Sequence, residues 1–562
     1  MSEKEFNLLD EPWIRVTKQD LKIEEVSLKQ ALLNAREYRD LAGEMPTQDV
    51  AVFRLLLACA LTIFYRYDSD GREEAIDGDW DKQDITNRAI EYWRKGKLPE
   101  AATVNYLERY RERFWLFHPE TPFYQVAGLE YGTDFDTKTL FGNLKESNNK
   151  ATLHHFSMSE GQNLSRLSYA AATRWLVHLN GFCINIKNNK AAPGTKDPAG
   201  VGRLGRLGIT YIDGENLFER IMLNLVPYGP SGDSWASPNP VWEKEVCREQ
   251  SRRISPPDNL PELYTLQSRR VLLKKENTGT GRSSGYITGY RVLNGDFYSY
   301  ENDFNEPMTI WRTEEDKKTG AVAYIPKRHS SQTQIWREFP TLFDRGQDRR
   351  VPGVVQWVYR LCDEIPELRE RLITVKTAGM EYDGMAYSYV DSISDGITMS
   401  AYLLGSLGED WIPRITDEVG NCEKVAGTGI KFFAVKIGQL FGESTAKGKK
   451  TTTLSKKLTG NFYSRIDRGF RDWLFSIQPE TDSREEKLAE WRKAAYRCAL
   501  DVVMEYVKSL KQNAYRTHDA DGQTMSVPGI YNSYIRTIRS VYPDAVGTGM
   551  NVQREDDYEP EN

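Results

Sequence analysis

Apolar residues recur at steps of three and four positions in several parts of the chain, and this period predicts amphipathic helices. The pattern is clearest in residues 484–511, where one helical face collects Leu488, Trp491, Ala495, Cys498, Val502, Tyr506 and Leu510. A second strong helix is predicted to begin at Pro46 and Thr47, with Thr47 as its N-cap. Its apolar run, residues 50–65, is too short to span a bilayer and includes Arg54, so we expect a buried helix and no membrane partner.

Shorter apolar runs predict strands. Residues 7–16 are expected to form a buried strand interrupted by Pro12, and glycine and asparagine turns predict an antiparallel sheet further along. The candidate strands of that sheet are residues 264–266, 271–273, 286–292, 308–311 and 321–325, preceded by Ile209–Ile212.

From about residue 397 the sequence pattern is helical, and helices are predicted at 413–442, 451–475, 484–511 and 526–541. Four helices of this length favour a bundle. We therefore predict an α+β fold. A large mixed α/β domain with antiparallel strands covers residues 1–396, and a C-terminal four-helix bundle covers residues 397–562.

Charge restricts the partners that the chain can bind alone. The 562 residues carry 75 Lys and Arg against 81 Asp and Glu, a net charge of −6, whereas a free-standing DNA binder is normally basic. Nucleic acid would therefore have to meet local basic segments or be held partly by other subunits. The six cysteines are scattered without a CxxC pair, which favours reduced thiols in a cytoplasmic protein over a zinc site or a disulfide framework.

Two common catalytic motifs are absent. The sequence contains no HExxH and no GxxxxGK[ST], and its one histidine pair, His154–His155, is a weak metal site because adjacent side chains of an extended segment point to opposite sides. We predict no catalytic residues, no metal and no cofactor. Two alternatives stay open, namely a metal-dependent nuclease whose residues these motifs miss and a purely structural scaffold subunit.

Three segments concentrate positive charge. In residues 200–208, GVGRLGRLG, the glycines would let the backbone approach a DNA minor groove while Arg203 and Arg206 add charge; a tight turn with solvated arginines is the alternative. The other two segments would hold a phosphate backbone or form solvated faces, and their lysines are Lys274, Lys275, Lys447, Lys449, Lys450, Lys456 and Lys457.

Three stretches in a fixed order resemble one family. NLLDEPWIRV (7–16), FWLFHPETPFYQV (114–126) and LQSRRVLL (266–273) are similar to segments of CasA, the large subunit of the type I-E CRISPR Cascade complex. The resemblance implies an RNA-guided antiviral complex in which this subunit recognises the protospacer-adjacent motif (PAM) in double-stranded target DNA, helps to start unwinding and recruits the helicase-nuclease effector. The implied partners also include the other Cascade subunits and, through the complex, the CRISPR guide RNA.

The resemblance also implies roles for particular residues. The family's glycine loop falls at 200–208, with Gly200 and Gly202 nearest the minor groove. Its wedge hairpin falls at 381–387, with Gly384, Met385 and Ala386 at the tip in place of the usual amide-bearing residue. Its lysine finger corresponds to Arg291. Its flexible complex-contact loop falls at 149–165, with His155 and Phe156 as the anchor. Some members bind zinc before the finger, but residues 274–285 contain no cysteine.

Overall fold

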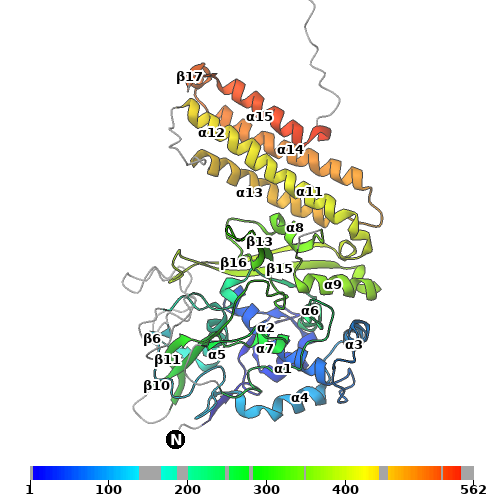
Figure 1. Ribbon diagram of the computed structural model, residues 1–562, viewed down its shortest axis with the longest axis vertical. Coiled ribbons are helices and arrows are strands. Elements are labelled where there is room, and N and C mark those ends of the chain that lie inside the picture. The colour runs from blue at the N-terminus through cyan, green and yellow to red at the C-terminus, as the bar shows by residue number, and fades with distance from the viewer. Residues whose placement is uncertain are drawn as a thin grey trace, which may run out of the picture. The chain divides into compact units, whose positions relative to one another are not determined.

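The computed structural model describes residues 4–137, 166–186, 200–246, 252–277, 283–346, 350–441, 453–520 and 523–545. The described chain forms two compact units, shown in Figure 1. The first unit contains Met1–Ile335 and Thr341–Ile397, and the second contains Trp336–Pro340 and Thr398–Asn562. Within the first unit, helices and mainly antiparallel sheets are mixed, which confirms the predicted fold class.

The helices of the first unit surround one apolar helix. They are α1 (Leu28–Leu33), α2 (Pro46–Arg66), α3 (Lys82–Lys95), α4 (Glu100–Arg109), α5 (Tyr169–Phe182), α6 (Leu217–Asn224), α7 (Leu260–Tyr264), α9 (Gly353–Glu364) and α10 (Pro366–Arg369), while α8 (Phe339–Phe343) crosses the boundary between the units. Helix α2 is buried along almost its whole length and packs against α5 and α7. Among the described residues it alone is long and apolar enough to cross a membrane, and 94% of its most apolar window is buried inside the fold.

The strands of the first unit form several small sheets. Two sheets have three strands each: β3 (Ile23–Val26), β2 (Ile14–Lys18) and β4 (Tyr38–Leu41) form one, and β16 (Tyr389–Ser400), β15 (Leu372–Tyr382) and β8 (Ile209–Ile212) form the other. A four-stranded sheet contains β10 (Arg269–Asn277), β11 (Ser283–Asn294), β6 (Thr133–Asp136) and β7 (Leu167–Ser168). Three further sheets are pairs of strands: β13 (Trp311–Glu315) with β14 (Val322–Pro326), β1 (Glu5–Asn7) with β5 (Trp115–Phe117), and β12 (Asp296–Phe297) with β9 (Arg252–Arg253). The β9–β12 pair is parallel, and the pairs of β2, β11 and β13 with their neighbours are antiparallel.

The second unit is helical. Its long elements are α11 (Trp411–Lys424), a π-helical segment (Val425–Ile430), α12 (Lys431–Leu440), α13 (Thr453–Phe475), α14 (Arg484–Lys508) and α15 (Val527–Val541), with a small hairpin of β17 (His518–Ala520) and β18 (Gln523–Met525). Helix α11, the π-helical segment and α12 follow one another as one continuous helical segment. Helix α12 contacts α13 and α15, and α14 also contacts α13 and α15. This ring of contacts is the packing of a four-helix bundle.

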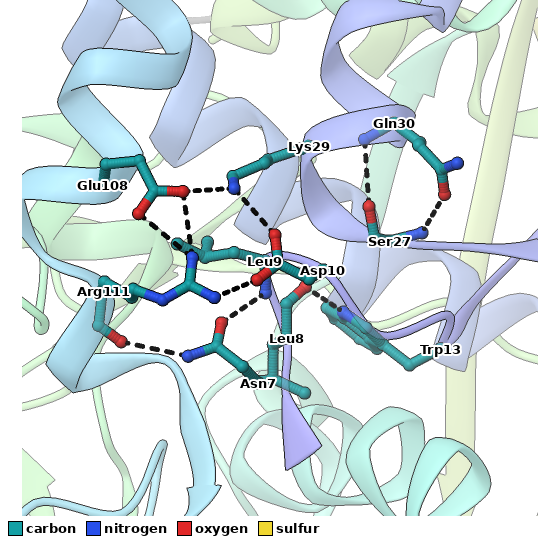
Figure 2. Close-up of polar contacts among 10 residues, drawn as sticks. All are labelled: Asn7, Leu8, Leu9, Asp10, Trp13, Ser27, Lys29, Gln30, Glu108 and Arg111. Atoms are coloured by element: carbon teal, nitrogen blue, oxygen red, sulfur yellow. Dashed lines mark hydrogen bonds and ion pairs between the residues drawn. The ribbon is translucent and has the colours of Figure 1, made fainter.

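The N-terminal NLLDEPW stretch is a turn between two strands and not the single strand that was predicted. Figure 2 shows its polar contacts: the Asn7 carboxamide accepts a hydrogen bond from the Leu9 amide at 3.0 Å, and the Trp13 indole donates to the Leu8 carbonyl at 3.0 Å. Asp10 forms ion pairs with Lys29 and Arg111. These residues therefore fix the turn, so this part of the family signature has a structural role.

Two other local expectations were wrong. Helix α2 begins at Pro46 as predicted, but Met45 occupies the N-cap position and the Thr47 hydroxyl instead pairs with His178 Nε2 at 3.1 Å. Residues 264–266 do not form a strand, because Tyr264 is the last residue of the short helix α7, which Asn259 caps at its start, and Thr265 is its C-cap.

Candidate nucleic-acid interface

Strands β15 and β16 form a hairpin (Figure 1). The tip of this hairpin is an ordered turn and carries an exposed apolar side chain. The Asp383 carboxylate accepts hydrogen bonds from the Tyr387 amide at 2.8 Å and from the Ser388 hydroxyl at 3.1 Å. Ala386 has φ +58°, in the left-handed region that L-residues seldom adopt. Met385 is 73% exposed, the most exposed of the large hydrophobic side chains that the structure describes. The turn thus holds an apolar group outward at the position predicted for the wedge.

The glycine loop lies beside this tip, and Asn185 joins the two. The Asn185 side-chain oxygen accepts a hydrogen bond from the Gly200 amide at 2.9 Å, and its own backbone amide donates to the Ala386 carbonyl at 2.7 Å. Tyr382, at the end of β15, donates to the Phe182 carbonyl at 2.8 Å. Two segments nearly 200 positions apart in the sequence therefore form one site. Asn185 was not predicted, because an asparagine in a polar stretch carries no distinguishing pattern.

The LQSRR stretch fixes the loop from the other side. Arg269 is 4% exposed and donates hydrogen bonds to the Gly200 carbonyl at 2.8 Å and to the Ile184 carbonyl at 3.3 Å. The neighbouring Ser268 hydroxyl accepts a hydrogen bond from the Arg203 amide at 3.4 Å. This motif, which carried the resemblance, therefore positions the backbone of the glycine loop.

Most glycines of the loop are required by packing inside the protein. A Cβ at Gly202 would lie 2.4 Å from the Gly181 carbonyl oxygen, and one at Gly208 would lie 1.9 Å from the Lys327 carbonyl oxygen. A Cβ at Gly205 would meet the Tyr382 hydroxyl at 2.2 Å. Gly200 differs because it is half-buried and has φ +129°. Gly202 is buried, so its lack of a side chain is explained by helix α5 and not by a groove of DNA.

Two arginines supply charge around the loop and the tip. The Arg206 guanidinium lies 4.9 Å from the centre of the Tyr300 ring and packs against Gly200. Arg328 is exposed, and its guanidinium lies 5.9 Å from the centre of the Tyr382 ring. Neighbouring protein atoms partly desolvate the guanidinium and lower the pKa of Arg328, Tyr382 opposes this lowering, and the like charge of Arg206 adds to it. An anion placed here would relieve the repulsion between the two cations.

Arg203 does not belong to the surface of this site. It is 3% exposed and forms ion pairs with Asp303 at 3.0 Å and with Glu306 at 3.2 Å, and Glu306 also pairs with Arg54 at 2.8 Å. Buried charges need such partners because solvation is lost. The expectation that Arg203 contacts DNA is corrected by this burial, since its guanidinium belongs to an internal ionic network.

The other predicted cations lie apart from the loop and have carboxylate partners. Arg291 forms a two-bond ion pair with Asp134 at 2.8 and 3.1 Å, which lowers the pKa of Asp134 to about 2. Lys274 pairs with the same carboxylate at 3.0 Å, and Lys275 pairs with Glu5 at 2.6 Å. These pairs reduce the positive charge of the predicted patch, and DNA binding by Arg291 stays a prediction.

The remaining predicted residues belong to other parts of the chain. Lys456 and Lys457 are exposed near the start of α13 in the second unit. His155, Phe156, Lys447, Lys449 and Lys450 lie outside the described residues. Within the described ranges, the structure brings together no three His, Cys, Asp or Glu side chains that could hold a metal ion.

Comparisons with known proteins identify relatives over nearly the whole chain. The family described as CRISPR-associated protein Cse1 matches residues 7–502. A CRISPR-associated protein CasA/Cse1 of Thermus thermophilus is 31% identical over 512 residues, which cover 89% of this chain and 92% of the relative. The crystal structure of Thermobifida fusca Cse1 has a TM-score of 0.76 at 25% identity and covers 97% of this chain and 99% of that one. A chain of a CRISPR RNA-guided surveillance complex shares the fold, with a TM-score of 0.68 at 19% identity over 95% of this chain and 100% of that one.

Proposed function

The chain belongs to the CRISPR-associated Cse1 (CasA) family, and on that premise we propose that it is the large subunit of an RNA-guided surveillance complex. In this proposal it acts by binding and carries no catalytic site. It recognises the PAM in double-stranded DNA, helps to open the adjacent duplex and recruits the helicase-nuclease. Guide RNA pairing then reads the long target sequence, while this subunit reads only the short flanking motif.

The observation that carries the proposal is the joined site of the glycine loop and the hairpin tip. Asn185 holds both segments through the Gly200 amide and the Ala386 carbonyl. Arg206 and Arg328 would neutralise phosphates at the rim of a groove, and Met385 would enter between base pairs as an apolar wedge. A thioether cannot replace an amide in hydrogen bonding, so we expect Met385 to act on duplex opening more than on the choice of motif.

The test uses the chain assembled with its partner subunits and guide RNA. Arg206→Gln and Arg328→Gln should each weaken binding of the target duplex and flatten the dependence of log affinity on log salt by about one unit for each lost phosphate contact. Lys97→Gln is the matched control, because Lys97 is exposed and lies away from this site.

Met385→Ser should leave the initial, salt-dependent association unchanged and slow strand opening, measured with a fluorescent base beside the PAM. Target binding and opening that are unchanged in the Arg206→Gln, Arg328→Gln and Met385→Ser variants would refute the proposal. An equal loss of duplex binding in the Lys97→Gln control would also refute the proposal, because it would show that binding depends on the net charge of the protein and not on this site.

A further inference from the structure

A cleft of the first unit lies among α3, α9 and the segment that follows α6, and its volume is about 450 Å³. Figure 1 shows α3, α6 and α9 grouped together, and α6 contacts both of the others. The start of α3 and the start of α9 both border the cleft, together with the segment that follows α6. A volume of this size lies in the range of small-molecule sites. The residues that line it are different from those of the glycine loop and the hairpin tip.

Three cations line the cleft, each lying over an aromatic ring. Arg345 lies 3.5 Å from the centre of the Tyr359 ring, Arg350 lies 4.3 Å from that of Phe304, and Lys82 lies 4.9 Å from that of Tyr228. Contact with a ring face holds a cation in place without using its N–H donors. Among the described residues, no carboxylate lies within ion-pair distance of Lys82, Arg345 or Arg350.

A fourth cation increases the positive charge. Arg360 pairs with Glu364 at 2.9 Å, but its Nε is buried and has no hydrogen-bond acceptor within the part of the chain that the structure describes. Partial burial lowers the pKa of Lys82, and the charges of Arg360 and Arg345 lower it further. Asp363 also borders the cleft, whereas Glu306 is fully buried and already paired with two arginines. The cleft therefore holds an excess of positive charge whose members repel one another.

Aromatic side chains form the remaining walls. Tyr228 and Phe304 line the cleft and are half-buried, so part of each ring is open to a ligand, whereas Trp235, Trp311 and Trp357 are almost fully buried. A ligand that fits must combine negative charge for the cations with a flat apolar part for the aromatic walls. A nucleotide has both parts, since its phosphate accepts charge-assisted hydrogen bonds and its base stacks on rings and guanidinium planes.

We propose that this cleft binds a nucleotide, with the phosphate held by Lys82, Arg345 and Arg360 and the base against the half-buried rings of Tyr228 and Phe304. A free nucleoside phosphate and one nucleotide of a single-stranded nucleic acid both carry the required phosphate and base. The site stands on the first unit's own residues and is independent of the proposed reading of duplex DNA.

The test is calorimetric titration of the full-length chain with three probes: adenosine triphosphate, inorganic tripolyphosphate and a short oligothymidylate. Adenosine triphosphate should bind at one site and more tightly than tripolyphosphate. Arg345→Gln and Lys82→Gln should each weaken it roughly tenfold or more, as expected for loss of a charge-assisted hydrogen bond. Arg345→Lys should restore part of the loss, and Lys97→Gln, at an exposed position after α3, should have no effect.

The outcomes separate the sources and can overturn the site. Displacement of adenosine triphosphate by oligothymidylate would identify a nucleic-acid strand as the source, and failure of displacement would identify a free nucleotide. Tripolyphosphate that binds as tightly as the nucleotide would overturn the role of the base. No binding of adenosine triphosphate, or binding that Arg345→Gln and Lys82→Gln leave unchanged, would overturn the site.

Discussion

Replacing Gly202 by alanine separates internal packing from DNA contact as the reason for the glycine. The new Cβ would lie 2.4 Å from the Gly181 oxygen and 2.7 Å from the Gly181 carbonyl carbon, and both atoms belong to the backbone of α5. Overpacking of this kind costs about 1–3 kcal/mol. Relief by movement of the loop would also stretch the hydrogen bond from the Gly202 amide to the Cys183 carbonyl, now 2.8 Å, which adds about 1 kcal/mol. We expect Gly202→Ala to lower the free energy of unfolding by about 2–4 kcal/mol.

The assay is unfolding of the full-length chain by urea, followed by tryptophan fluorescence, together with hydrogen exchange of the peptide that contains residues 200–208. Because the chain has two units, the free energy of unfolding is taken from the transition of the unit that contains Gly202, and the whole chain is not fitted as a single transition. Gly384→Ala is the matched control, since no heavy atom lies within 4 Å of its added Cβ. The packing explanation would be refuted if the Gly202→Ala protein unfolds at the same urea concentration as the Gly384→Ala protein and shows unchanged hydrogen exchange in residues 200–208.

Three further predictions follow from buried contacts. Glu306→Gln should lower the free energy of unfolding by about 3–5 kcal/mol, because the buried charges of Arg54 and Arg203 would lose the Glu306 carboxylate. The loss is measured by urea unfolding, with Glu100→Gln at an exposed position as the control. A loss for Glu306→Gln no larger than that for Glu100→Gln would contradict the prediction. His178 is buried and its pKa is lowered to about 3, so the folded chain binds fewer protons there than the unfolded chain. The difference in free energy of unfolding between the native protein and His178→Phe should therefore be constant above pH 6.5 and should shrink by about 1.4 kcal/mol per pH unit as the pH falls toward 4. A difference in urea unfolding that does not change with pH would contradict this prediction. Asn185→Ala should increase hydrogen exchange in residues 200–208 and also at the hairpin tip, because it removes the acceptor for the Gly200 amide; a change in neither segment would show that Asn185 does not position them.

Helices of clear period were predictable because burial of one face imposes that period on the sequence. The predicted stretch 484–511 corresponds to α14 (Arg484–Lys508), and 526–541 corresponds to α15 (Val527–Val541). Residues 82–109 form two helices, α3 and α4, because Gly96 takes the left-handed conformation that ends α3. The long strands β15 and β16 were not predicted, because their side chains are partly buried on both faces and the alternation is weak.

The candidate site was predictable only in part. The glycine loop and the hairpin tip were identified separately through the resemblance, whereas their junction at Asn185 depends on tertiary packing that a local pattern does not encode. Arg203 and Arg206 look equivalent in the sequence, but Arg203 is buried in the ionic network with Glu306 and Arg206 is half-buried beside Gly200. Charge counts along a sequence cannot tell a solvated cation from a paired one.

Site-specific photocrosslinking from position 385 is the most direct test of contact between the joined site and the target duplex. The complex would be assembled with guide RNA, a photoreactive residue in place of Met385 and a labelled target. We predict crosslinks to the base pairs next to the PAM, and their loss when the PAM is mutated. Crosslinks confined to other subunits, or to DNA distant from the PAM, would contradict the assignment.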